Sequence, residues 1–208
     1  MPNTPNLDPV KSYFGKRIEE FGASPRGVDW NSDASQNVRF DQLFKVIEGD
    51  QQFSILDYGC GYGALADYLV EKGFDADYYG YDIVESAIEL ARKLHIGKPR
   101  HTFVAASMEL TVCDYTVASG IFNVRGEQSF EDWTNYVISV LHHFNSLSRM
   151  GFASNFLTKY SDANKMRADL YYADPLYLFD YCKRNFSKNI ALLHDYHIYD
   201  FTIIVRRD

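Results

Sequence analysis

A glycine-rich stretch, ILDYGCGYGALADYL at residues 55–69, constrains the fold of this chain more than any other feature. An apolar run precedes it, Gly59, Gly61 and Gly63 alternate within it, and a helical pattern follows. Glycines in a turn between a strand and a helix let a ligand approach the backbone without a Cβ clash. Because several classes of cofactor bind at such turns, the stretch predicts an α/β fold and leaves the ligand open.

Apolar strands alternate with amphipathic helices through the rest of the chain. We predict strands at 53–57, 77–83, 101–106, 114–120 and 151–157, and helices near 64–72, 85–95 and 130–147. Asp174 and Pro175 are expected to start another helix as its cap and first residue. Two final strands within 189–196 and 198–207 should form an antiparallel hairpin with four or five residues between them. This order predicts a seven-stranded, mostly parallel sheet with an antiparallel last strand and helices on both faces.

The 208 residues suffice for one structural domain. Residues 1–50 contain two helical patterns, at 9–22 and 38–48, and we expect them to form an N-terminal helical cap. Residues 51–208 then form the sheet domain. A polar, tyrosine-rich stretch at about 157–174 is predicted to be a lid insert in that domain.

Charge and cysteine usage exclude several classes of partner. The net charge of -7 argues against a nucleic-acid partner. No apolar run approaches the roughly 18 residues that a membrane span requires, and the N-terminus does not resemble a signal peptide. The three cysteines show no CxxC spacing, so we predict neither a metal site nor a disulfide framework. We therefore expect a cytoplasmic protein, monomeric or homodimeric, without a membrane, nucleic-acid or metal partner.

Two nucleotide-binding interpretations of the glycine stretch can be tested against its neighbours. A P-loop requires Lys followed by Ser or Thr after the last glycine, and here Ala64 and Leu65 follow Gly63. A dinucleotide site is harder to exclude, because residues 59–64 satisfy GxGxxA and Asp82 ends the next predicted strand. An NAD-linked oxidoreductase therefore stays open as an alternative.

Asp57 favours a different ligand. It ends the first predicted strand two residues before Gly59, where a carboxylate would repel the pyrophosphate of a dinucleotide. The same carboxylate would attract a ligand with an ammonium group and no phosphate. S-adenosylmethionine is such a ligand, and Asp82 could accept hydrogen bonds from both of its ribose hydroxyls.

The segments LDYGCGYG, YGYDI and DYTVASG, followed by the terminal hairpin, resemble the class I S-adenosylmethionine-dependent methyltransferases. The acid of the second segment, Asp82, comes 25 residues after Asp57, and the resemblance covers roughly residues 53 to 208. It implies a Rossmann-like fold, S-adenosylmethionine as the cofactor and S-adenosylhomocysteine as its product. A non-catalytic cofactor-binding module on the same fold is the remaining alternative.

The resemblance also implies which residues bind the cofactor. Ser107 and Met108 stand where the family usually has an Asp near the adenine amine, and Arg39 is our candidate for holding the cofactor carboxylate. Arg39 could instead form an ion pair on the surface. Gly63 could instead serve only a tight turn and the packing of the following helix. The predicted cofactor residues are Asp57, Gly59, Cys60, Gly61, Gly63, Asp82, Ile83, Ser107, Met108, Ser119, Gly120 and Arg39.

The acceptor is expected to be a small polar or anionic metabolite, methylated at oxygen by in-line displacement. The loop after the fourth strand is SGIFNVRG, without the NPPY-type tetrapeptide of enzymes that methylate amino groups of DNA and some proteins. Cationic and hydroxyl-bearing side chains in the predicted lid suggest the anionic character. The predicted substrate residues are Arg125, Lys159, Arg167, Tyr171 and Tyr172, and the catalytic candidates are His194, Tyr172 and Asn123. A solvated loop and a structural histidine are the alternatives.

Overall fold

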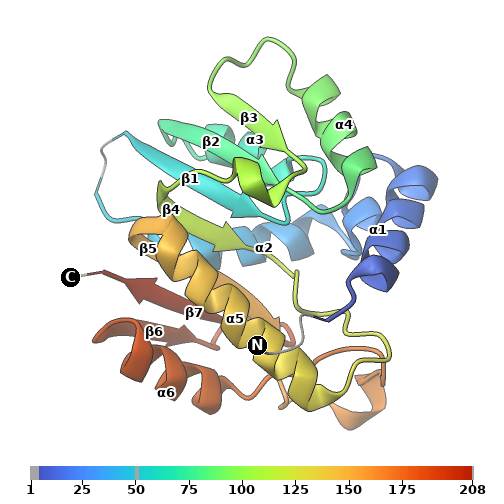
Figure 1. The fold of residues 1–208 in the computed structure, drawn as a ribbon, viewed down its shortest axis with the longest axis vertical. Coiled ribbons are helices and arrows are strands. Elements are labelled where there is room, and N and C mark those ends of the chain that lie inside the picture. The colour runs from blue at the N-terminus through green and yellow to red at the C-terminus, as the bar shows by residue number, and fades with distance from the viewer. Residues whose placement is uncertain (1–4, 50–51, 208) are drawn as a thin grey trace.

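The computed structural model describes residues 5–49 and 52–207, which share one seven-stranded sheet of order β3-β2-β1-β4-β5-β7-β6 (Figure 1). β7 pairs antiparallel with both β5 and β6, and the other pairings are parallel. The predicted sheet, with its antiparallel last strand, is therefore confirmed. The strands are β1 (Phe53–Tyr58), β2 (Ala76–Tyr81), β3 (His101–Val104), β4 (Cys113–Ala118), β5 (Ser148–Leu157), β6 (Asn189–Leu193) and β7 (Asp200–Arg206).

Helices cover both faces of this sheet, as predicted. Figure 1 shows α5 and α6 in front of it and α2 and α3 behind it. Phe40, Leu65 and Ile88, from α2, α3 and α4, share one hydrophobic cluster, and Phe144 and Leu178, from α5 and α6, belong to another. The helices are α1 (Asp8–Phe21), α2 (Asp33–Leu43), α3 (Ala64–Glu71), α4 (Glu85–Leu94), α5 (Phe130–Leu147) and α6 (Pro175–Asn185).

Capping residues mark the starts of the helices. Ser129 accepts a hydrogen bond from the backbone of Asp132 at 3.0 Å, and Asp174 caps α6, so both predicted starts are confirmed. The start predicted for the second N-terminal helix was wrong. Ser32 accepts a hydrogen bond from the backbone of Ser35 and begins α2 at Asp33, five residues before the predicted start at Val38.

The terminal hairpin also differs from the prediction. Both strands are shorter than expected, and residues 194–199 form a longer connection in which His197 has a φ of +31°. The predicted boundary between cap and sheet domain, at residues 50 and 51, lies outside the described residues. Within the described part of the chain, no helix has both the length and the apolar character needed to span a membrane.

The N-terminal segment lies beside the carboxyl ends of the parallel strands. Figure 1 shows α1 at the side toward which the arrows of β1, β3 and β4 point. Val10 and Ile18 are buried on the inner side of α1, and this helix contacts the 3₁₀ helix Pro25–Val28 and α4. Since ligands of open α/β sheets bind at this edge, α1 is placed as a cover over it.

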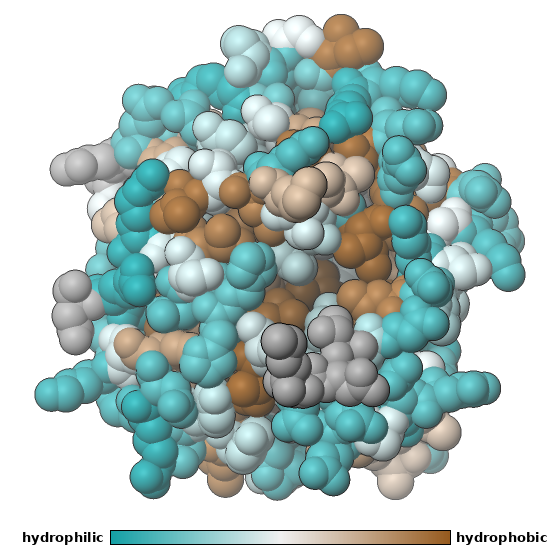
Figure 2. Space-filling model, viewed as in Figure 1, coloured by the Kyte–Doolittle hydropathy of each residue, from teal (hydrophilic) through white to brown (hydrophobic). Residues whose placement is uncertain are grey.

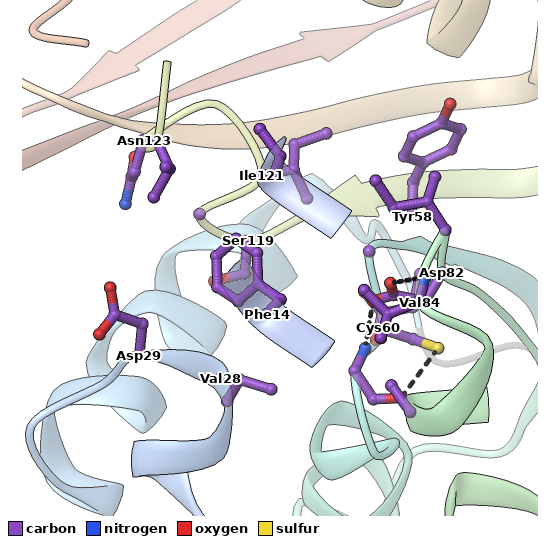
Figure 3. A pocket seen from close by; sticks show the side chains of 18 of the residues that line it. Phe14, Val28, Asp29, Tyr58, Cys60, Asp82, Val84, Ser119, Ile121 and Asn123 are labelled. Atoms are coloured by element: carbon purple, nitrogen blue, oxygen red, sulfur yellow. Dashed lines mark hydrogen bonds between the residues drawn. The ribbon is translucent and has the colours of Figure 1, made fainter. Parts of the chain in front are cut away.

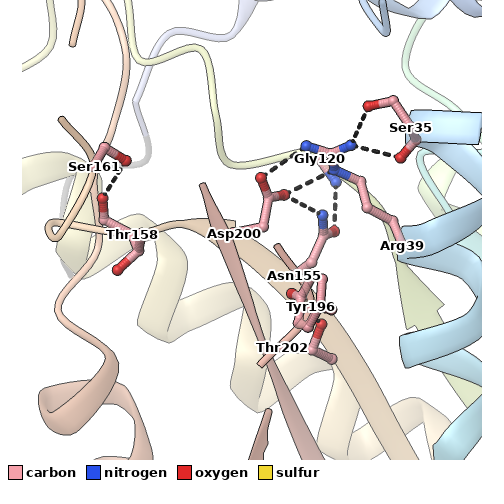
Figure 4. Close-up of polar contacts among 9 residues, drawn as sticks. All are labelled: Ser35, Arg39, Gly120, Asn155, Thr158, Ser161, Tyr196, Asp200 and Thr202. Atoms are coloured by element: carbon pink, nitrogen blue, oxygen red, sulfur yellow. Dashed lines mark hydrogen bonds and ion pairs between the residues drawn. The ribbon is translucent and has the colours of Figure 1, made fainter. Parts of the chain in front are cut away.

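A buried ion pair joins the N-terminal segment to the last strand (Figure 4). Nε and Nη2 of Arg39, in α2, donate to the two carboxylate oxygens of Asp200 at 2.8 and 2.7 Å. Asp200 also accepts from Nδ2 of Asn155 in β5, and Oδ1 of Asn155 accepts from the backbone N–H of Gly120 at 2.9 Å. The Trp30 ring lies over the Arg39 guanidinium at 4.0 Å. One network thus fixes α2, β5, β7 and the loop after β4 relative to one another.

We expect Asp200→Asn to lower the free energy of unfolding by about 3–5 kcal/mol, because it leaves the buried Arg39 guanidinium without a counter-charge. Asp180→Asn, which breaks an exposed pair with Arg184 on α6, is the matched control and should change that free energy by less than about 1 kcal/mol. Urea denaturation followed by circular dichroism measures both. Equal losses in the two variants would contradict this role of the buried pair.

Candidate functional site

A cavity of about 300 Å³ lies at the carboxyl ends of β1, β2 and β4, under α1. In the space-filling view, apolar side chains line a hollow on the face that Figure 1 presents (Figure 2). Figure 3 shows residues that line the cavity; they come from α1, the 3₁₀ helix Pro25–Val28, the glycine loop after β1, and the loops after β2 and β4. The loops after β1, β2 and β4, which carry most of the predicted cofactor residues, are therefore brought together.

The glycine loop gains its shape from left-handed backbone conformations. Gly59 and Gly61 have φ values of +87° and +55°. A Cβ on Gly59 would lie 2.2 Å from Cγ2 of Ile121, and one on Gly61 would lie 2.6 Å from Cγ1 of Val28. Only glycine fits here, because a side chain would be strained at these φ values and would collide with the opposite wall. Both glycines line the cavity, as does the buried Cys60.

Gly63 has a different environment. Its φ is +89°, and a Cβ there would lie 2.8 Å from Nε2 of His95 and 2.9 Å from the Phe103 ring. It is not among the residues that line the cavity. The geometry therefore favours the alternative role for Gly63, a tight turn that brings α3 close to the sheet.

Asp57 lies at the bottom of the cavity and is only 3% exposed. Its carboxylate accepts a hydrogen bond from the Tyr78 hydroxyl at 2.7 Å. Burial raises the pKa of Asp57 to about 7; the Tyr78 hydrogen bond opposes this rise and the nearby Asp82 charge adds to it. A cationic group bound in the cavity would favour the ionised form of Asp57.

Asp82 lies at the other side of the glycine loop. Its two oxygens accept hydrogen bonds from the backbone N–H groups of Gly61 at 2.9 Å and Val84 at 2.8 Å. Burial raises its pKa, and these hydrogen bonds oppose the rise. Ile83 and Ser107 also line this part of the cavity, whereas the Met108 side chain is 95% exposed and does not.

The loop after β4 forms the opposite wall. Gly120 has a φ of +75°, and a Cβ there would lie 2.5 Å from the Trp30 ring. Ser119 Oγ and Asn123 Oδ1 are buried without a hydrogen-bond partner, and both residues line the cavity. Because buried polar atoms are nearly always paired, these two atoms mark positions where a ligand could bind.

Arg39 occupies a different place from the one its predicted role requires. Its Nε and Nη2 bind Asp200, and its Nη1 donates to the backbone oxygen and the hydroxyl of Ser35 at 2.7 and 2.8 Å. It is not among the residues that line the cavity. Neither predicted role matches this placement, since the pair is buried and not on the surface. Trp30 lies on the guanidinium and does line the cavity.

The lid cations surround a second, open hollow outside this cavity. Arg125, Lys159 and Arg167 line it together with Tyr172. Lys159 pairs with Asp174 at 2.7 Å, and Arg167 pairs with Asp169. Arg125 donates to the backbone oxygens of residues 128, 168 and 170. These cations therefore make contacts that stabilise the insert. From the sequence alone, this structural role could not be distinguished from binding of an anionic ligand.

The remaining candidates lie in three different environments. Tyr171 is 2% exposed, and its hydroxyl lies 3.0 Å from that of Thr134. The Tyr172 hydroxyl accepts from the backbone N–H of Arg167. His194 is exposed in the connection between β6 and β7, beside the Tyr160 and Phe201 rings. Of the three catalytic candidates, only Asn123 lines the cavity.

Several cavity residues were absent from the predicted site. Phe14 and Asp29 come from the N-terminal segment, and Tyr58, Trp133 and Tyr136 come from β1 and α5. Trp133 is 1% exposed and also belongs to the hydrophobic cluster that α5 shares with β5. The one signal for Asp29 was its position in a loop rich in Gly and Pro.

The donor and acceptor set of the cavity suits a cationic ligand with hydroxyl groups. Asp57 and Asp82 present carboxylates on either side of a backbone that glycine leaves uncovered. Ser119 and Asn123 add unpaired polar atoms on the opposite wall. These residues therefore fit the amino and ribose groups of S-adenosylmethionine. In the described part of the chain, no group of three or more His, Cys, Asp or Glu residues is placed to hold a metal ion.

Comparisons with known sequences identify the family of this chain. A family model described as "Methyltransferase domain" matches residues 55–150. The chain is 48% identical to "Putative methyltransferase Rv1506c" of Mycobacterium tuberculosis over 163 residues, which is 78% of this chain and 98% of that protein. It is also 36% identical, over 43% of its length and 37% of the relative's, to 2-heptyl-1-hydroxyquinolin-4(1H)-one methyltransferase of Mycobacteroides abscessus.

Solved structures share the fold at low sequence identity. A DhpI–SAM–HEP complex superimposes with a TM-score of 0.67 at 14% identity and covers 99% of this chain and 100% of that one. The N-methyltransferase NodS from Bradyrhizobium japonicum, in complex with S-adenosylhomocysteine, has a TM-score of 0.63 at 11% identity and covers 95% of this chain and 98% of that one.

The buried Asp57 predicts an unusual dependence of stability on pH. Its pKa in the folded protein, about 7, lies above its ordinary value of 3.8, so ionisation disfavours the folded state. Its contribution to stability therefore falls as the pH rises from about 4 to 7 and is constant above that range.

We expect the free energy of unfolding of Asp57→Asn to exceed that of the unmodified protein by an amount that grows between pH 5 and pH 7, by on the order of 2 kcal/mol, and is constant at higher pH. Chemical denaturation at several pH values measures this difference. A difference that is constant with pH would show that Asp57 is already ionised in the folded protein.

Proposed function

The chain belongs to the class I S-adenosylmethionine-dependent methyltransferases, and on this basis we propose that it methylates a small molecule at an oxygen atom. The observation that carries the proposal is the single cavity that extends from the glycine loop, past Ser119 and Asn123, to the inner side of α1. A cofactor and a small acceptor can share such a space.

The residues around the glycine loop would hold the cofactor. Asp82 would accept hydrogen bonds from the ribose hydroxyls, with Ile83 and Ser107 beside the adenine. Asp57 would attract the ammonium group, while the backbone at Gly59 and Gly61 would contact the methionine part. When bound, the cofactor supplies an electrophilic methyl carbon on a sulfonium sulfur, which keeps the bonding electron pair and becomes the neutral thioether of S-adenosylhomocysteine.

The protein's own contribution would be orientation and exclusion of water. α1 covers the carboxyl ends of the strands, and Val10 and Phe14 from it line the cavity. An oxygen nucleophile held in line with the methyl group then reacts without a bimolecular encounter in solution. We propose the segment up to residue 50 as a cap that provides this cover, and residues 157–174 as an insert beside it.

Two observations support a small molecule over a nucleic acid. The N-terminal segment covers part of the cavity, and a base within a polymer would need a channel that leaves room for its neighbours. The net charge of -7 also opposes binding to a phosphate backbone. We therefore propose a monomeric or homodimeric enzyme with a small-molecule substrate.

Two further observations support oxygen as the accepting atom. The loop after β4 is SGIFN at residues 119–123, without an NPPY-type tetrapeptide. The Mycobacteroides abscessus relative is named for an acceptor that carries a hydroxyl group. The fold alone does not decide the atom, because it supports many chemistries.

We expect S-adenosylhomocysteine to bind the protein and NADH not to bind, as measured by isothermal titration calorimetry. Asp82→Ala should weaken the binding of S-adenosylhomocysteine about 10- to 100-fold, because two hydrogen bonds to a carboxylate are lost. Asp75→Ala is the control, since Asp75 precedes the other end of β2 and its side chain is 64% exposed. Equal effects of the two changes, or preferential binding of NADH, would refute this cofactor site.

We also expect the affinity for S-adenosylhomocysteine to rise with pH. The ligand's ammonium group would pair with ionised Asp57, whose pKa is raised by burial to about 7, so binding at lower pH must first remove a proton. The dissociation constant should be about tenfold larger at pH 6 than at pH 8. The Asp57→Asn variant should bind weakly and without this dependence, and an equally steep dependence in that variant would exclude Asp57 as its source.

A further inference from the structure

α1, α5 and the loop after β4 form a mostly apolar wall of the cavity. Together with Leu7, which precedes α1, they contribute the side chains of Val10, Phe14, Val124, Trp133 and Tyr136. Among the described residues that line the cavity, the charged ones are Asp29, Asp57 and Asp82, and none is Lys, Arg or His. An anionic acceptor would therefore find no cationic side chain among the residues that line the cavity.

Asp29 and Asn123 bring polar side chains to this wall, in addition to the hydroxyl of Tyr136. In Figure 3 they lie on the side opposite Asp82 and Cys60. Trp30, which follows Asp29, contacts Gly120, and Nδ2 of Asn123 lies 3.5 Å from the position of a Cβ on Gly120. The two side chains thus approach one end of the cavity from neighbouring segments.

Asp29 is held in place by strong local contacts. Its φ of +65° is rare for a residue with a side chain and carries a conformational cost. Its carboxylate accepts from the Tyr13 hydroxyl at 2.8 Å and pairs with Arg17 at 3.1 Å, and its side chain remains 29% exposed. A carboxylate has about four acceptor positions, so Asp29 keeps capacity for a donor in the cavity.

Asn123 supplies a second acceptor. Its Oδ1 is buried and has no hydrogen-bond partner. A buried acceptor without a partner is unfavourable, and a hydrogen-bond donor on a ligand would remove this penalty. Two acceptors at the end of an apolar space match a group that donates hydrogen bonds and bears no negative charge.

We propose that the acceptor molecule has an apolar body and an uncharged hydroxyl group, and that Asp29 accepts the one hydrogen bond that this hydroxyl can donate, with Asn123 beside it. The proposal rests on the proposed function and narrows its substrate class. It also replaces the anionic metabolite that the lid cations suggested, because Lys159 pairs with Asp174, Arg167 pairs with Asp169, and both cations line a separate hollow.

Two probes with the same apolar body test the proposal, 2-naphthol and 2-naphthoate. Binding of S-adenosylhomocysteine is measured first. If it does not bind, the proposed function is refuted, and this failure is distinct from a failure of the acceptor proposal. Calorimetry on the protein saturated with S-adenosylhomocysteine should then show 2-naphthol binding at least about tenfold more tightly than 2-naphthoate. Failure of 2-naphthol to bind, or equal or tighter binding of 2-naphthoate, would overturn the inference.

Two variants separate recognition from a purely structural role of Asp29. Asp29→Asn and Arg17→Gln both break the same ion pair, but only the first changes a residue that lines the cavity. We expect Asp29→Asn to weaken 2-naphthol binding about tenfold and Arg17→Gln to change it less than threefold, with S-adenosylhomocysteine affinity preserved in both. Equal losses of 2-naphthol binding in the two variants would show that Asp29 only ties its loop to α1.

Discussion

The ion pair between Arg39 and Asp200 is the contact on which the shape of the site depends. A buried charge pair of this kind adds little net stability compared with apolar packing, but either partner alone is strongly unfavourable. The sequence is therefore committed to one arrangement, in which α2 docks at the start of β7. Through Asn155 the same network holds the N–H of Gly120, and through Trp30 it covers that glycine. Arg39, Asn155 and Asp200 do not line the cavity, but their hydrogen bonds hold the wall that lies opposite the glycine loop.

The cavity combines two kinds of surface in sequence along its length. Near β1 and β2, acidic side chains lie beside uncovered backbone, which suits a ligand with ammonium and hydroxyl groups. Toward α1 the walls become apolar, and the polar atoms that remain accept hydrogen bonds. Such a division would let one cavity take a cationic methyl donor near Asp57 and an uncharged acceptor beside the apolar wall. The low-dielectric burial that raises the pKa of Asp57 has the same origin as the exclusion of water from the reacting atoms.

The sheet, the glycine loop and the two acids could be predicted because their signals are local. The alternation of apolar residues in the strands, the spacing of the glycines and the number of residues between Asp57 and Asp82 can all be read along a short stretch of the sequence. The far end of the site could not be predicted in this way, because it forms where the N-terminal segment docks on the sheet. Arg39 was expected to bind the cofactor, and its partner is 161 positions away. The cations of the insert were visible in the sequence, but their pairing, such as Lys159 with Asp174, depends on how the insert folds.

The separation between Arg39 and Asp200 also has a consequence for biosynthesis. Domains form from the N-terminus as the chain leaves the ribosome, and Arg39 emerges long before its counter-charge. Until β7 has been made, α2 lacks the ion pair that joins it to the sheet. A nascent chain that already contains the complete glycine loop therefore still lacks the contact that fixes α2 and Trp30 relative to the cavity.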